Sequence, residues 1–294
     1  MRMRDTRLRA SAAITVAIAI TFAAVAGFMS LPASAARTLP ADDRTHARAQ
    51  ADVTGDGVDD SILLVGHPHS DDSQFCTSHD VVVYDGVTGD RITMVLGGTS
   101  GGYPGTLFVG RIDGDSALDV VVAIPSGGSG GITNPFVVSF QGGKPRFLGD
   151  PQALARGAQL DAHGLDHFKV RITDSERGRQ FILGLPGPGS ISGPELDYYG
   201  GIYSKSGKLI QPLDIDIDDV GALEIVSTPG EGLNELVTYQ KIWAVAHANS
   251  IGSVRTVWRW TGRQFAIASV DVTPIFTPEA YAEYIASFDK SRPA

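Results

Sequence analysis

Residues 52–66 read DVTGDGVDDSILLVG, an acidic loop that runs directly into an apolar stretch. The same frame returns without gaps as RIDGDSALDVVVAIP at 111–125 and as STPGEGLNELVTYQK at 227–241. Between them, RITDSERGRQFILGL at 171–185 keeps the frame but has lost nearly all of its acidic residues. Four copies spaced by about 60 residues indicate an internal repeat in which each unit is one supersecondary structure.

Each copy precedes a segment in which β-branched and aromatic residues flank a glycine-containing turn, the pattern of a β-hairpin. These segments are VVVYDGVTGDRITMVL (81–96), FVVSFQGGKPRFLG (136–149), YYGGIYSKSGKLIQPL (198–213) and VRTVWRWTGRQFAIAS (254–269). With the strand before each acidic loop, such as 106–110 or 168–172, every unit has four strands. Short surface helices are expected only at 151–160 and 278–288.

The sequence therefore predicts an all-β protein of four repeats, each of about 60 residues and four strands, arranged like the blades of a β-propeller. A closed ring and an open one both remain, because four blades make a small propeller. Two β-sandwich-like domains with similar loops are the alternative. The expected organisation is a flexible segment at 36–47, the repeat domain at 48–275, and a C-terminal helix and tail at 276–294.

Residues 1–35 have the composition of a secretory signal peptide. Four arginines and one aspartate precede an apolar run, and LPASAAR supplies a small-residue cleavage site after Ala35. We expect cleavage there and a secreted or cell-envelope protein; an uncleaved membrane anchor is the alternative. The whole chain has a net charge of −9, so the part after the leader carries −12. Such an acidic surface argues against nucleic acid and anionic membranes as partners.

The acidic loops place oxygen-bearing residues at alternate positions, where they can converge on one point. Six to eight oxygen ligands suit Ca²⁺, a hard cation. A solvated acidic turn is the alternative interpretation. The first loop offers Asp52, Thr54, Asp56, the Val58 carbonyl and Asp60. The second keeps Asp113, Asp115, the Ala117 carbonyl and Asp119.

The other loops have lost ligands. Position 1 of the second loop is Arg111, which we expect to pair with the aspartates in place of the ion. The third loop has Arg171 and Arg179 at its ends and is predicted to be metal-free. The fourth keeps only Glu231 and Glu235. The repeated turn is thus expected to be structural first, with calcium reinforcing it where acidic residues remain.

An acidic loop such as DVTGDGVDD before an apolar strand resembles the FG-GAP/VCBS repeat of integrin-α-like propellers. The resemblance covers about 50–270 and is strongest in the first two loops. Residues 101–131, GGYPGTLFVGRIDGDSALDVVVAIPSGGSGG, also resemble secreted VCBS-repeat proteins of Gram-positive bacteria. This family resemblance implies that the loops bind calcium and that the protein has a role in adhesion or ligand binding. Integrin-type propellers have more blades than four, so ring closure stays open.

Other polar and aromatic residues suggest further sites. His67, His69 and His79 lie in one connection rich in aspartate and are a candidate transition-metal group. The single cysteine, Cys76, has the pattern of a small buried hydrophobe. A sugar-stacking platform or core packing are the two interpretations of the three tryptophans, Trp243, Trp258 and Trp260.

Two functions follow from these patterns. The first is a secreted, calcium-stabilised, non-enzymatic binding or structural module at the cell envelope, with an extracellular protein or glycan as its partner. The second is a secreted hydrolase that uses loop carboxylates on a β-propeller scaffold. Two facing carboxylates in a deep cleft would favour the hydrolase, and a shallow polar face would favour binding. The sequence contains no convincing catalytic group.

Overall fold

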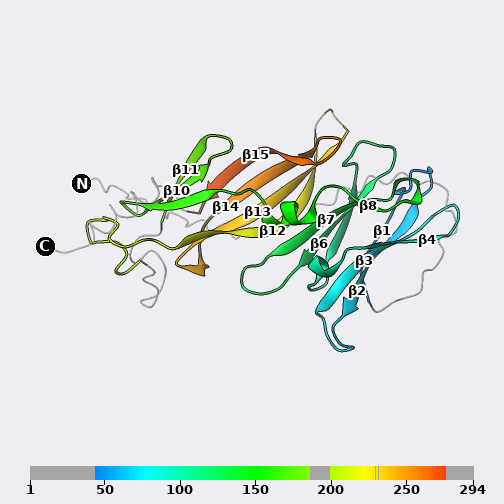
Figure 1. The fold of residues 1–294 in the computed structure, drawn as a ribbon, viewed down its shortest axis with the longest axis horizontal. Helices are drawn as coiled ribbons and strands as arrows, with labels where there is room; N and C mark the ends of the chain where they lie inside the picture. Colours follow the sequence, from blue (N-terminus) through cyan, green and yellow to red (C-terminus); the bar gives the residue numbers. More distant parts are fainter. Residues whose placement is uncertain (1–43, 186–198, 229, 231, 276–294) are drawn as a thin grey trace, which may run out of the picture. The chain divides into compact units, whose positions relative to one another are not determined.

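The computed structural model describes residues 44–185, 199–228, 230 and 232–275 (Figure 1). The expected signal peptide, its cleavage site and the helix expected at 278–288 lie outside these residues. Within them the protein is all-β, as the sequence predicts, with four antiparallel sheets. The expected helix at 151–160 is present as α1 (Pro151–Arg156), capped by Asp150, whose side chain accepts a hydrogen bond from Gln152 N.

Two of the sheets have the same construction, four strands in chain order. The first sheet consists of β1 (Thr45–Ala51), β2 (Asp60–Pro68), β3 (Cys76–Tyr84) and β4 (Arg91–Val95). The second consists of β5 (Thr106–Gly110), β6 (Asp119–Pro125), β7 (Thr133–Ser139) and β8 (Arg146–Phe147). The short 3-10 turns η1 (Gly98–Ser100) and η2 (Gln141–Gly143) follow β4 and β7. Both hairpins expected from the first two repeats are therefore confirmed.

The remaining sheets differ from each other in size. The fourth sheet has four long strands, β12 (Ile215–Ser227), β13 (Asn234–Ala244), β14 (Ala246–Trp260) and β15 (Phe265–Pro274). The third has three, β9 (Asp161–Leu165), β10 (Lys169–Asp174) and β11 (Arg179–Gly184), in the order β11-β10-β9.

The prediction of four strands in the third repeat is wrong for the described residues. The hairpin expected at 198–213 has only isolated bridges, between Gly200 and Tyr203 and between Tyr203 and Leu209. The loop of the third repeat that corresponds to the acidic loops is also shorter, because Asp174 already pairs with Arg179 across the β10–β11 hairpin. Asp174 accepts hydrogen bonds from the backbone and guanidinium of Arg177, so a tight turn replaces the nine-residue loop.

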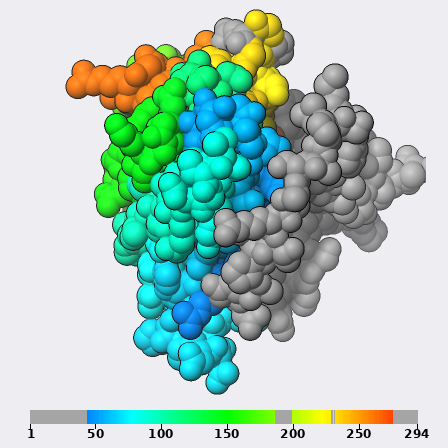
Figure 2. Space-filling view, turned by 90° about the vertical axis from the view of Figure 1, so that its right-hand side faces the viewer, coloured from blue at the N-terminus to red at the C-terminus, as the bar shows by residue number. Residues whose placement is uncertain are grey.

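The second sheet is buried on both faces. Val120 and Val122 of β6 pack in one hydrophobic cluster with Ile62 and Leu64 of the first sheet. Val121, pointing the other way, packs in another cluster with Leu236 and Trp258 of the fourth sheet. Successive strand residues face opposite sides, so this arrangement explains the unbroken apolar run of β6. In the space-filling view the first sheet, blue to cyan, lies directly against the second, in green-cyan (Figure 2).

A third hydrophobic cluster joins the third and fourth sheets. It includes Val170 and Leu183 of the third sheet and Ile242, Val254 and Val270 of the fourth. The long strands of the fourth sheet therefore cover the second sheet with one portion and the third sheet with another. The third sheet does not lie between the second and fourth sheets, as a simple sequential ring would require. In the described part of the chain no helix is long and apolar enough to cross a membrane.

Candidate functional site

The first two acidic loops occupy equivalent connections. Residues 52–59 join β1 to β2, and residues 111–118 join β5 to β6. The last acid of each, Asp60 and Asp119, begins the second strand and has a fully buried side chain. Asp60 Oδ2 accepts hydrogen bonds from the N–H groups of the residues at positions 2 and 3, and Asp119 Oδ2 does the same. The two loops are closed by the same contact.

In the first loop the carboxylates are largely occupied by the backbone. Asp52 accepts hydrogen bonds from three N–H groups, at distances of 2.6, 3.2 and 2.9 Å, from Gly55, Asp56 and Gly57. Asp60 Oδ1 accepts from Gly86 N at 2.9 Å and lies 3.4 Å from the hydroxyl of Thr54. The Asp56 and Val58 side chains are exposed, and Asp56 Oδ1 accepts from Val58 N at 2.9 Å. Much of the acidity of this loop thus caps its own turn.

The second loop leaves two buried carboxylate oxygens without a hydrogen-bond partner, Asp115 Oδ2 and Asp119 Oδ1. Asp113 Oδ1 accepts a hydrogen bond from Asp115 N. Asp115 Oδ1 accepts one from the backbone N–H of the buried Ala117. Burial raises the pKa of Asp119 to about 7, and the charges of Asp113 and Asp115 add to this rise. Burial also raises the pKa of Asp115. The surroundings of Asp115 and Asp119 therefore disfavour the charged form of both carboxyl groups.

The arginines near the second loop pair differently from the expectation. Arg111 Nη1 donates to the backbone carbonyl of Asp115 at 2.7 Å, not to a carboxylate, so its predicted pairing with the aspartate side chains is wrong. The partner of Asp113 is Arg146 of β8, at 3.0 Å. Arg146 lies in the following hairpin, and nothing in the spacing of the loop could have identified it. Half of its side chain is exposed, so the ion pair is accessible to water.

Loops from three sheets lie next to one another. Leu118 N of the second loop donates to Asp52 O of the first at 2.9 Å. On the other side, Arg111 and Asn234 exchange two hydrogen bonds, Arg111 N to Asn234 Oδ1 at 2.8 Å and Asn234 N to Arg111 O at 2.7 Å. Glu235 of the fourth loop pairs with Arg259 at 2.6 Å, and Glu231 lies outside the described residues.

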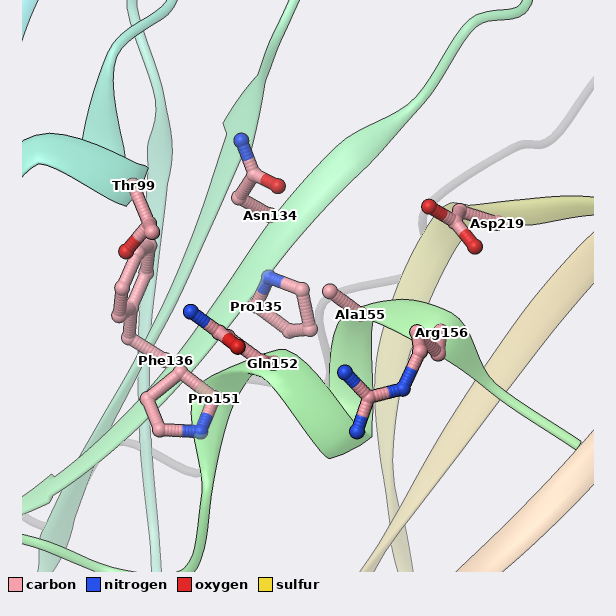
Figure 3. Close-up of a pocket in the computed structure, with 9 residues that line it drawn as sticks. All are labelled: Thr99, Asn134, Pro135, Phe136, Pro151, Gln152, Ala155, Arg156 and Asp219. Carbon is pink, nitrogen blue, oxygen red and sulfur yellow. The ribbon is translucent and has the colours of Figure 1, made fainter.

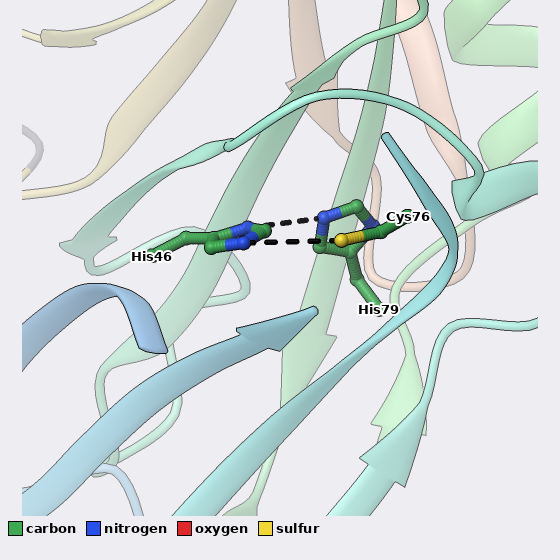
Figure 4. A group of neighbouring side chains, drawn as sticks. All are labelled: His46, Cys76 and His79. Atoms are coloured by element: carbon green, nitrogen blue, oxygen red, sulfur yellow. Dashed lines mark hydrogen bonds between the residues drawn. The ribbon is translucent and has the colours of Figure 1, made fainter. Parts of the chain in front are cut away.

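The predicted grouping of His67, His69 and His79 is wrong. His67 Nε2 bonds to Asp80 at 2.9 Å, and His69 is exposed in the β2–β3 connection. His79 is opposite Gly66 in the register, whereas His67 is opposite Ser78, so the two histidines point to opposite faces of the sheet. The fully buried His79 instead meets His46 of β1 and the buried Cys76 (Figure 4). Cys76 was predicted as a buried residue, and this is confirmed.

Comparison with known proteins relates the chain to one named group. Residues 158–273, which include the third and fourth sheets, match the family model described as the YybI C-terminal domain. Over 224 residues the chain is 29% identical to a Bacillus subtilis (strain 168) protein called "Uncharacterized protein YybI". That alignment covers 76% of this chain and 82% of the relative, and so extends well beyond the third and fourth sheets. Neither name states an activity.

A pocket of about 230 Å³ lies where α1 meets β7 (Figure 3). Asp219 is the one carboxylate among its lining residues, and the guanidinium of Arg156 lines the same pocket. Its volume is below the roughly 300–1,000 Å³ of typical small-molecule sites. The pocket therefore lacks the pair of facing carboxylates that a hydrolase of the expected kind needs.

Trp243 lies apart from the other two tryptophans. Trp258 is buried and packs between the second and fourth sheets with its indole N–H bonded to the hydroxyl of Thr238, and Trp260 packs against the same cluster. Trp243 stacks on His247 with a centroid distance of 4.4 Å, and its indole N–H donates to Asp218. Core packing is thus confirmed for Trp258, and the three rings form no common platform.

Proposed function

We propose that the protein is a secreted, calcium-stabilised repeat protein of the FG-GAP/VCBS type that acts as a non-enzymatic binding or structural module at the cell envelope. Its partner is an extracellular protein or glycan. The observation that carries the calcium part is the pair of buried, unpartnered oxygens, Asp115 Oδ2 and Asp119 Oδ1. A buried carboxylate without a partner is costly, and a divalent cation would supply both the missing ligand contact and the counter-charge.

The donor set of the second loop fits a hard cation. Asp113, Asp115 and Asp119 provide only oxygen, and Ca²⁺ accepts six to eight oxygen ligands in flexible geometry. In the first loop Asp56 is exposed and receives one N–H, so its second oxygen is free to turn toward an ion. Among the described residues, no three acidic side chains of either loop bring oxygens as close together as the ligand atoms of the His46 group. The loops would therefore contract on binding.

A propeller-like arrangement of the repeats is part of this proposal. Its support is the row of loops from the first, second and fourth sheets and the burial of the second sheet between the other two. Neighbouring blades of a propeller pack face to face in this way. The third sheet packs on the fourth sheet instead of taking the place between the second and the fourth, so the arrangement we propose is an open one.

Binding is favoured over hydrolysis by the lack of a second carboxylate in the pocket beside α1. The net charge after the expected leader also fits a partner that is neutral, basic or bridged by cations. A large exposed face formed by loops is the usual site of recognition on a rigid β-scaffold.

The test is binding of the purified protein to isolated cell envelopes, either with a chelator or with calcium at about 10 mM. That concentration is roughly ten times the weakest dissociation constant of extracellular calcium modules, about 10⁻⁴–10⁻³ M. We expect retention in the envelope fraction with calcium and loss of retention with chelator. Digestion of the envelopes with protease or with glycan hydrolases then tells a protein partner from a glycan. Equal retention with and without calcium would contradict the proposal, and turnover of a glycan substrate would support the hydrolase.

A further inference from the structure

His46, Cys76 and His79 form a compact group of nitrogen and sulfur ligands that the proposed function does not use. One ligand atom from each residue lies within 4.8 Å of the other two. His46 Nδ1 is 3.2 Å from His79 Nε2, and His46 Nε2 is 3.9 Å from Cys76 Sγ (Figure 4). The residues come from β1 and β3, on either side of β2. Cys76 and His79 are neighbours on β3, whereas His46 lies 30 residues from Cys76 and is brought to them only by the fold.

Each of these two separations, made by a different nitrogen of His46, is by itself close to a ligand–ligand distance in a metal site. A tetrahedral Zn²⁺ with bonds of about 2.0–2.1 Å to nitrogen and about 2.3 Å to sulfur holds two nitrogens about 3.3 Å apart, and a nitrogen and a sulfur about 3.6 Å apart. His46 would contribute one of its two nitrogens. Its side chain is only partly buried, so its ring can turn to select that nitrogen, whereas His79 and Cys76 are held in the interior.

Gly66 of β2 makes room for the group. A Cβ at this position would overlap His46 Cε1 and would lie 2.6 Å from Cys76 Sγ. Gly66 lies within an extended strand, where glycine costs stability relative to residues with side chains. Its backbone does not require glycine, but the approach of the imidazole and the thiol does. The strand between the ligands therefore leaves a cradle that fits them.

His79 is oriented by a second contact of the kind found behind metal ligands. Its Nδ1 lies 2.5 Å from the carbonyl oxygen of Ser100, and its backbone N–H donates to Ser100 Oγ at 2.8 Å. A carbonyl can only accept, so Nδ1 carries the proton and Nε2 presents its lone pair toward His46 and Cys76. Metal-bound histidines typically donate their other N–H to such an acceptor, which fixes the ring.

We infer that His46, Cys76 and His79 are three ligands of a Zn²⁺ site that ties β1 to β3 across Gly66. A mixed nitrogen and sulfur donor set suits Zn²⁺ and excludes Ca²⁺, which takes oxygen. The Cys76 thiol releases its proton to solvent when the zinc–sulfur bond forms. The fourth position is left to water or to a group of the partner, since the three residues are the only members of the group in the described chain.

The experiment measures metal content and ligand identity on the purified protein. After removal of metal and addition of Zn²⁺, we expect about one tightly held zinc per chain by elemental analysis. Replacement with Co²⁺ should give a near-ultraviolet thiolate-to-cobalt charge-transfer band together with the visible bands of a tetrahedral ion. The charge-transfer band reports on Cys76 specifically, because the chain has no other cysteine.

Five variants make the test specific. Cys76→Ser should abolish the charge-transfer band, and His46→Ala, at a partly exposed position, should weaken zinc binding by more than the about 10–100-fold typical of a lost outer contact. Gly66→Ala keeps all three ligands but fills their cradle, and should also lose the ion. The matched control is His69→Ala, which should retain one zinc. Asp119→Asn should retain the cobalt band, since the acidic loops do not contribute.

Circular dichroism checks that each variant is folded. If Cys76→Ser, at a buried position, does not fold, His46→Ala carries the test. The proposal is overturned if the wild-type protein retains no zinc, or if its zinc content is unchanged in both His46→Ala and Cys76→Ser. Preference for Cu⁺ over Zn²⁺ in direct competition would overturn the choice of ion. These outcomes are independent of calcium binding to the envelope module.

Discussion

Asp60 and Asp119 occupy the same position in two equivalent loops, but only Asp60 has both carboxylate oxygens hydrogen-bonded. Asp60 Oδ1 accepts the N–H of Gly86, whereas Asp119 Oδ1 has no hydrogen-bond partner. Both side chains are fully buried. The same residue at the same place therefore completes one turn and leaves the other incomplete, and the two can be told apart by substitution.

Asp119→Asn should raise the stability of the calcium-free protein and remove the part of its calcium response that comes from the second loop. An asparagine oxygen can accept the two N–H groups now bonded to Oδ2, while the unpartnered anionic oxygen is replaced by a neutral amide. For the wild type, calcium at about ten times its dissociation constant contributes roughly 1.4 kcal/mol, a melting shift of about 3–6 °C. Thermal melts with calcium and with chelator measure both effects.

Asp60→Asn is the matched comparison and should lower stability under both conditions. Its Oδ1 and Oδ2 both accept N–H groups, so an amide nitrogen at either place leaves a buried donor without an acceptor. That loss costs about 1–3 kcal/mol. Equal effects of the two substitutions in chelator would contradict the difference between the loops.

The calcium-free protein should become less stable as the pH rises from about 4 to about 7. The pKa of Asp119 is raised to about 7 in the folded state, against about 3.9 for an unperturbed aspartate. A raised folded-state pKa favours the protonated form, so this contribution is present below the unfolded value and is lost as the pH passes through the folded one. Urea unfolding across this pH range, with wild type and Asp119→Asn in chelator, measures it. A wild-type slope identical to that of the variant would refute the assignment to Asp119.

The second sheet should be equally sensitive on its two faces. Val121→Ala and Val122→Ala each remove a fully buried side chain, and each should cost about 1–3 kcal/mol of unfolding free energy. A sheet with one wet face would give one large value and one near zero. Val87→Ala, at a position that is 62% exposed, is the control and should change stability by less than about 0.5 kcal/mol. Chemical denaturation provides the measurement.

The exported protein should begin near Ala36 or Arg37. The change in composition after Ala35 predicts cleavage there, and mass spectrometry of the extracellular protein identifies the N-terminus. Recovery of the intact leader in the membrane fraction would instead support an anchored form.

The sequence was sufficient to predict the elements that repeat. The frame shared by 52–66 and 111–125 correctly placed two loops in equivalent connections, because strand alternation and turn glycines are local signals. The prediction for the third repeat failed because Asp174 and Arg177 close a tight turn that the loop alignment concealed. Its partner sheet was also hidden, since packing of the third sheet on β13 and β14 depends on contacts between distant residues.

The candidate sites show the same division. The acidic positions could be recognised in the sequence. The capping of the first loop by Asp52 and the pairing of Arg146 with Asp113 could not, because both depend on backbone geometry. The histidine and cysteine group was missed because His46 lies 30 residues from Cys76. The glycine opposite His79 was the one local signal, and it has meaning only when the register of β2 and β3 is known.

The contact of Trp258 and Leu236 with Val121 has a consequence for where this chain can be divided. The segment that matches the YybI C-terminal model begins at residue 158, after the second sheet has ended. Cutting the chain there would remove Val121 and Val137 and expose the apolar face of the fourth sheet that they cover. The boundary of the family model is therefore not a boundary of folding. The C-terminal segment, expressed alone, would need another surface in place of the second sheet to remain monomeric.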